Sequence, residues 1–196
     1  MTALPLTRPT AVLVPDLATA AEGARITLEA LGIDLDDESL SRTPERMVAA
    51  LAELLTPRPF HLTTFPNDGG YDELIVARGI PFRSLCEHHM LPFVGTANVG
   101  YIPGERILGL SKLARVVEHF AARVQVQERL TVQVARWLDA QTSPVGVGVV
   151  VEAEHLCMTL RGVQAPGTMT VTSTLLGSLH DDPRTRSEFL AMTGRP

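Results

Sequence analysis

The chain has 196 residues, of which 45% are hydrophobic and 20% charged, and 17 basic against 22 acidic side chains give a net charge of −5. Its length predicts one globular domain of about 150 residues with an additional segment. The net acidity argues against a nucleic-acid binder, and no apolar run approaches the roughly 18 residues of a membrane helix. Two cysteines do not make a disulfide framework, so a soluble cytoplasmic protein is predicted.

The first third of the chain divides into a tail and two helices. Residues 1–15 contain three prolines and no periodicity, which predicts a flexible tail. A helix is predicted from Asp16 to Gly32, and a second begins with Thr43 as N-cap and Pro44 as its first helical residue. We therefore expect an N-terminal helical hairpin over residues 16–56, followed by one larger domain over residues 57–196.

The pattern changes after residue 57, where strand-like and helical segments follow one another. Four strands and three helices are predicted in this part. The strands are 72–82, 93–102, 145–154 and 168–175, and the helices are 111–123 with Ser111 as N-cap, about 126–141, and a last one with Asp182 as N-cap and Pro183 in first position. Strands in pairs around two helices predict an α+β domain with an antiparallel sheet.

The densest cluster of reactive side chains is the CEHH segment that begins at Cys86. Cys86 and His89 are three positions apart, so one helical turn would direct both toward one ion. The other cysteine, Cys157, follows His155 by two positions, and side chains two apart on a strand point to the same side. Two thiolates and one imidazole suit zinc and leave its fourth position open, which is the catalytic pattern. His88 and His155 then remain free for proton transfer.

Other interpretations of these residues stay open at this point. The two thiols could form a Cys86–Cys157 disulfide, although nothing in the sequence indicates an oxidising compartment. A structural site with two cysteines and two histidines is a second alternative. A buried thiol beside a solvated histidine pair is a third.

Basic residues flank the predicted metal site. Ser111, Lys112 and Arg115 open a helix, whose N-terminal amides favour anions, and Arg161 follows Cys157 by four positions. In an acidic protein this arrangement suggests a phosphorylated substrate, with ordinary surface charge as the alternative. Gln127 and Glu128 could pair with the edge of a nucleobase, or cap the start of a helix.

At these residues the sequence resembles GTP cyclohydrolase I, a zinc enzyme of pteridine biosynthesis. The resemblance covers about residues 20–196. The matching stretches include TPER (43–46), SLCEHHMLPF (84–93), GLSKLARVVEHFA (109–121), VQVQERLTVQVA (124–135) and VGVVVEAEHLCMTLRGVQ (147–164).

The resemblance implies a role for each matched position. The zinc ligands would be Cys86, His89 and Cys157, the catalytic residues His88, His155 and Ser111, the guanine-recognising pair Gln127 and Glu128, and the triphosphate-binding residues Lys112, Arg115, Arg161 and Arg46. It also implies the tunnelling fold, in which antiparallel sheets of five subunits close into a ring and two rings stack into a decamer with active sites between subunits.

The implied reaction converts GTP and water to 7,8-dihydroneopterin triphosphate and formate, the first step of tetrahydrofolate and pterin biosynthesis. A paralogue for a specialised pterin or deazapurine pathway, or a non-catalytic zinc-bound subunit, would preserve much of the same pattern. The chain also departs from frequent family residues: Asn98 stands for His, Gly79 for Asp and Met90 for Leu, and the loop 165–168 lacks a lysine.

Overall fold

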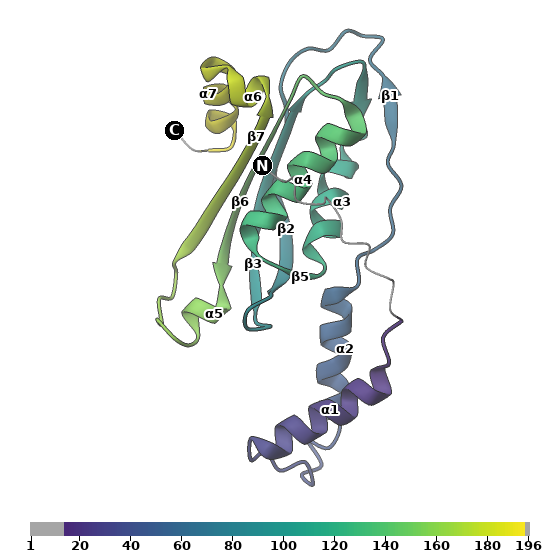
Figure 1. The fold of residues 1–196 in the computed structure, drawn as a ribbon, viewed down its shortest axis with the longest axis vertical. Coiled ribbons are helices and arrows are strands. Elements are labelled where there is room, and N and C mark those ends of the chain that lie inside the picture. Colours follow the sequence, from purple (N-terminus) through teal and green to yellow (C-terminus); the bar gives the residue numbers. More distant parts are fainter. Residues whose placement is uncertain (1–13, 195–196) are drawn as a thin grey trace, which may run out of the picture. The chain divides into compact units, whose positions relative to one another are not determined.

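The computed structural model describes residues 14–194, so residues 1–13 of the predicted tail lie outside the described part. The chain divides into two compact units, one ending at Thr56 and the other beginning at Pro57 (Figure 1). Among the described residues, no helix is both long and apolar enough to cross a bilayer.

The first unit consists of two helices that pack against each other, α1 (Leu17–Ala30) and α2 (Thr43–Leu55). Asp16 caps α1 by accepting a hydrogen bond from the Thr19 amide at 3.0 Å. The predicted N-cap of α2 is wrong by one position, because Thr43 is already helical and the preceding Arg42 makes no side-chain cap. The predicted helical hairpin is confirmed, but of the residues in α1 only Ala24 is buried.

A five-stranded sheet organises the second unit, with the strand order β5-β2-β3-β6-β7. β2, β3, β6 and β7 are antiparallel to their neighbours, and the two-residue β5 runs parallel to β2. The strands are β2 (Ile75–Cys86), β3 (Pro92–Ile102), β5 (Val124–Gln125), β6 (Gly146–His155) and β7 (Met169–Gly177), while β1 (Thr64–Pro66) and β4 (Arg106–Leu108) form a separate pair. β2 extends four residues beyond its predicted end at residue 82, because residues 83–85 pair with β3.

Two helices, α3 (Ser111–Ala121) and α4 (Gln127–Thr142), cover one face of this sheet (Figure 1). Alternate residues of β3 and β6 point into the space between, so that Phe93, Val99, Val147 and Val149 are fully buried there with apolar residues of both helices. This layer contains the main core of the unit. The predicted α+β class, with an antiparallel sheet and a helical pair, is confirmed.

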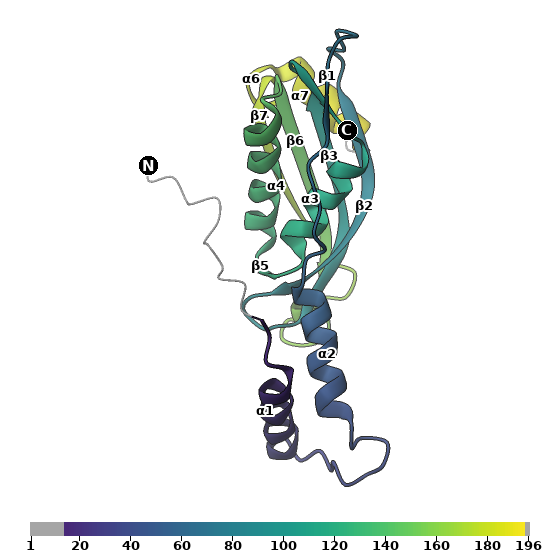
Figure 2. The same cartoon turned by 90° about the vertical axis from the view of Figure 1, so that its right-hand side faces the viewer.

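The short α6 (Ser178–Asp181) and α7 (Pro183–Met192) cover the opposite face at one end only, where β6 begins (Figure 2). Three glycines of the sheet, Gly100, Gly146 and Gly148, form a glycine floor beneath them. A Cβ atom added at Gly148 would lie 2.7 Å from the Phe189 ring and from Leu179. The absence of side chains on this floor therefore lets the C-terminal helices sit directly on the strands.

A β-bulge interrupts the pairing of β2 with β3 between Ala77 and Ile80. Gly79 has a φ of +65°, which L side chains rarely adopt, and its N–H donates to the Asn98 Oδ1 of the neighbouring strand at 2.9 Å. Gly79 and Asn98, two of the residues that depart from those frequent in the family, are thus joined by one hydrogen bond.

Candidate active site

Three potential metal ligands converge at the end of the sheet where β2 and β6 finish. Cys86 is the last residue of β2, and His89 lies on the turn that follows, in which the Met90 amide donates to the Cys86 carbonyl at 2.8 Å. Cys157 lies in the four-residue helix α5 (Leu156–Thr159), directly after β6. The prediction that His155 and Cys157 share one side of a strand is therefore wrong, because the strand ends at His155 and a helical turn brings the thiol to the cluster.

The geometry of this cluster suits a metal ion. The ligand atoms of Cys86, His89 and Cys157 all lie within 4.8 Å of one another, and the two Sγ atoms are 4.0 Å apart. Two thiolates on a tetrahedral zinc would be about 3.8 Å apart, whereas a disulfide needs about 2.05 Å. Both cysteines are free, so the structure does not contain the alternative disulfide.

The environment of Cys157 resists ionisation when no cation is present. Burial raises the pKa of this thiol, and the neighbouring Cys86 raises it further, while Arg161 acts in the opposite direction. A bound metal ion would reverse this effect, since a coordinating thiol loses its proton. The Cys157 thiol is therefore placed to ionise most readily when a cation is bound beside it.

His155 is held in a fixed orientation at the end of β6. It lies opposite Phe93 of β3, and the two rings stack in parallel with centroids 4.7 Å apart. Its Nε2 is 2.8 Å from the Oε1 of Gln127. Burial lowers the pKa of His155, and the nearby carboxylate of Glu128 opposes this shift.

The Gln127 side chain is 1% exposed and belongs to a closed hydrogen-bond network. Its Nε2 donates to the carbonyl oxygens of Val151 at 3.1 Å and Thr170 at 3.0 Å, and to Thr172 Oγ1 at 3.2 Å. The hydroxyl of Thr131 lies 2.6 Å from that of Thr172 and donates to the Gln127 carbonyl at 2.8 Å. If the Gln127 amide paired with a nucleobase, as the sequence predicts, it would have to give up these hydrogen bonds.

The remaining predicted residues at this end are exposed around the cluster. Glu128 lies in the first turn of α4, and His88 lies on the CEHH turn with its Nδ1 3.8 Å from the Cys86 Sγ. Arg161 follows α5 and is close enough to Cys157 to act on its pKa. The structure therefore brings the three ligands, both histidines, Gln127, Glu128 and Arg161 to one end of the sheet.

Sequence patterns alone do not single out two further residues that support the site. Arg129 forms an ion pair with Glu87 in the middle of the turn, and its Nε donates to the buried Gln125 Oε1 at 2.9 Å. Phe93, which stacks on His155, was likewise not predicted. The register between β3 and β6 would have been needed to find it.

The predicted phosphate-binding residues of α3 are not part of this cluster. Ser111 and Lys112 begin α3, whose other end leads into β5 beside Cys86, so the length of an 11-residue helix, about 16 Å, intervenes. Ser111 is the first helical residue and not the predicted N-cap, a position that Leu110 takes. Arg115 pairs with Glu118 at 3.2 Å.

Arg46 belongs to the first unit. It is exposed there and donates to the Ser39 carbonyl at 2.8 Å.

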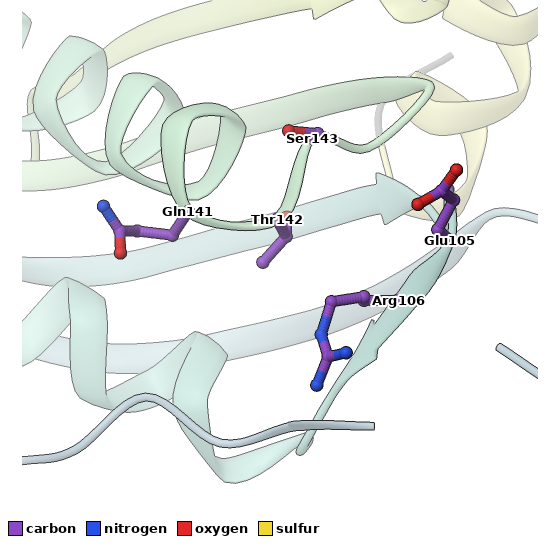
Figure 3. A pocket seen from close by; sticks show the side chains of 6 residues that line it. Glu105, Arg106, Gln141, Thr142 and Ser143 are labelled. Carbon is purple, nitrogen blue, oxygen red and sulfur yellow. The ribbon is translucent and has the colours of Figure 1, made fainter. Parts of the chain in front are cut away.

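A surface pocket lies at the opposite end of the second unit (Figure 3). It is lined by Gly104, Glu105 and Arg106 at one side and by Gln141, Thr142 and Ser143 at the end of α4. Arg106 is engaged there, because its Nε donates to Thr64 Oγ1 at 2.7 Å. None of the predicted catalytic or metal-binding residues lines this pocket.

Comparison with known proteins agrees with the geometry of the site. The sequence model of the GTP cyclohydrolase I family matches residues 20–194. One relative named GTP cyclohydrolase 1, from Synechococcus sp. (strain JA-3-3Ab), is 48% identical over 94% of this chain and 81% of its own length. Another of the same name, from Aquifex aeolicus (strain VF5), is 50% identical over 87% of this chain and 93% of its own length. The GTP cyclohydrolase 1 of Dictyostelium discoideum is 47% identical over 90% of this chain and 78% of its own length.

Among solved structures, the archaeosine synthase QueF-Like in the apo form overlaps 55% of this chain and 94% of its own, with a TM-score of 0.43 and 18% identity, a likeness too slight to bear on the fold. The relatives and the family match each span most of the chain. Together they show that the chain belongs to the GTP cyclohydrolase I family of enzymes.

Proposed function

We propose that this protein is a zinc-dependent enzyme that converts GTP and water to 7,8-dihydroneopterin triphosphate and formate, at the start of pterin biosynthesis in the cytoplasm. The observation that carries the proposal is the cluster of Cys86, His89 and Cys157 with His155 fixed beside it. A cluster of three ligands leaves one position of a tetrahedral ion open, as catalytic rather than structural zinc sites do.

The donor set supports zinc as the resident ion. Cys86, His89 and Cys157 would hold it, and the 4.0 Å between the two sulfur atoms needs little adjustment. When bound, the ion would supply a Lewis acid that activates water at neutral pH for attack on an electrophilic carbon.

The other side chains at this end would orient the base and move protons. The Glu128 carboxylate accepts from the ring N–H and amino group of guanine and so places C8 near the metal cluster. His155 takes the proton that the water loses as it adds to C8 and gives it to the imidazole nitrogen of the purine. The ring then opens and releases C8 as formate. His88 assists the later rearrangement of the ribose, with Ser111 near the sugar hydroxyls.

The triphosphate would be held by Lys112, Arg115, Arg161 and Arg46. Because Lys112 lies about a helix length from the metal cluster of its own chain, we propose that it serves the site of a neighbouring subunit. This fits active sites formed between subunits of a homodecamer built from two pentamers. The N-terminus of α3 would then face the phosphates of a GTP molecule bound in the site of the neighbouring subunit.

Turnover of GTP by the purified, zinc-loaded protein tests the reaction. Formate and the pterin chromophore should appear in equal amounts. Formate without pterin would assign ring opening alone to the site and point to a failure at His88 and Ser111. Neither product from a protein that binds zinc and assembles would contradict the proposal and favour a non-catalytic zinc-bound subunit.

Mixing two inactive variants tests the shared site. His155→Ala and Lys112→Ala chains, co-expressed in equal amounts, should form sites of which about one quarter combine an intact His155 with an intact Lys112 from the neighbour. Activity near that fraction of the wild-type value is the expected result. If both residues served a site within one chain, no mixed site would be intact and no activity would return.

A further inference from the structure

The orientation of the Gln127 amide is fixed by acceptors that cannot act as donors. Its Nε2 lies 3.1 Å from the carbonyl oxygen of Val151 and 3.0 Å from that of Thr170. If the amide were turned over, its oxygen would face both carbonyl oxygens without an intervening hydrogen. The nitrogen must therefore point toward the two strands, and the oxygen must point toward His155.

This orientation determines the hydrogen on His155. An amide oxygen can only accept, so the 2.8 Å contact requires that Nε2 of His155 carry a hydrogen. The Phe93 ring, stacked within 2° of parallel, holds the imidazole plane in which this bond lies. Nδ1 is left as the ring nitrogen that exchanges a proton with another molecule.

We propose that Gln127 is a positioning residue for His155, which fixes its tautomer and ring orientation so that Nδ1 faces the reaction, and that its side chain does not read the guanine base. The 1% exposure of Gln127 supports this assignment, since no surface of the side chain is presented to a ligand. A metal-site histidine held by an amide or carboxylate behind it is a general device for orienting an imidazole. The catalytic part of the inference rests on the proposed function, whereas the tautomer does not.

The tautomer can be measured without any turnover. The zinc-loaded protein is labelled with 15N-histidine, sedimented, and studied by magic-angle-spinning NMR at a pH where His155 is neutral. Among the six histidines, the His155 signals are those missing from a His155→Gln variant. Nε2 should carry the hydrogen in the wild type. A hydrogen on Nδ1 instead would overturn the proposal, whether or not the protein consumes GTP.

Kinetics of Gln127→Met then separate positioning from base recognition. Methionine keeps the length of the side chain but neither donates nor accepts, so we expect mixed tautomers of His155, a kcat about 10- to 100-fold lower and a KM for GTP within about threefold. A large rise in KM with kcat and tautomer unchanged would show that Gln127 reads the base and would overturn the inference.

The matched control is Thr172→Val, which removes one acceptor of the same amide and leaves the two backbone carbonyls in place. It should lower stability but leave the tautomer and kcat within about threefold of the wild type. If Thr172→Val lowers kcat and mixes the tautomers as much as Gln127→Met, general loosening of the network explains both, and the specific role of Gln127 is refuted.

Discussion

The two ends of the five-stranded sheet are built in opposite ways. At the end with Cys86 and His155, the strands finish in short turns, and thiols, imidazoles and carboxylates gather at or near the surface. α3 and α4 cover one face along the strands, whereas α6 and α7 are seated on the glycine floor of the other face at the opposite end only. The reactive groups and the seat of the two C-terminal helices are thus separated along the same strands, which predicts that substitutions at the two ends have different consequences.

The largest effect is expected from Cys157→Ser at the reactive end. Loss of one thiolate should empty the metal site and lower activity by about 1,000-fold or more, since a Lewis acid contributes several kcal/mol to such reactions. Zinc content per chain and GTP turnover measure the two consequences. Met158→Leu, a volume-conserving change in the same helix, is the control and should retain both. Full zinc occupancy in Cys157→Ser would contradict the assigned ligand set.

The two free histidines should differ from each other. His155→Asn should lower GTP consumption by about 100- to 10,000-fold, because ring opening loses its proton donor. His88→Asn should still consume GTP and accumulate a formylated, ring-opened intermediate, because it acts later. Chromatography of the reaction mixture distinguishes the two patterns. Equal and complete loss of GTP consumption in both variants would contradict this division of roles.

Phe189→Ala tests the packed end. The ring is fully buried on Gly100 and Gly148, so its removal should cost about 3–5 kcal/mol and lower the thermal midpoint at fixed protein concentration. The kcat of the folded fraction should stay within about threefold. Glu188→Ala on the exposed side of α7 is the control, with an effect within about 0.5 kcal/mol. A large loss of zinc affinity in Phe189→Ala would contradict the prediction that substitutions at this end leave the metal site unchanged.

The smallest effect concerns pH and His119 on α3. Burial and the charge of Arg123 lower its pKa, so the unfolded chain binds a proton more readily than the folded one. Stability should therefore fall as pH drops below the ordinary histidine value of about 6.5, and the loss should level off below the folded-state pKa. His119→Gln should remove this dependence, which thermal unfolding across pH measures.

The matched control for that pH series is His61→Gln, at an exposed position of the same unit. It should leave the wild-type pH dependence in place. If the pH dependence survives in His119→Gln but vanishes in His61→Gln, His61 causes it and the role given to His119 is wrong.

Local chemistry made much of this molecule predictable. Asp182 and Pro183 predicted the start of α7, where the Asp182 side chain accepts from two backbone amides. The spacing of Cys86, His89 and Cys157 predicted a cluster that the structure assembles. Features that depend on contacts distant in sequence were not predictable in this way, such as the parallel pairing of β5 with Cys86 and the stacking of Phe93 on His155. The burial of the Gln127 amide is of the same kind, since its acceptors lie 24 to 45 residues further along the chain.

The β-bulge at Gly79 has a consequence for sequence variation. Its positive φ restricts position 79 to glycine or to the few residues that tolerate this conformation, and its amide hydrogen needs the acceptor that Asn98 provides across the strand pair. A change at either position alters what the other must supply. Positions 79 and 98 are therefore expected to covary in evolution, and an exchange of both together should be tolerated better than either exchange alone.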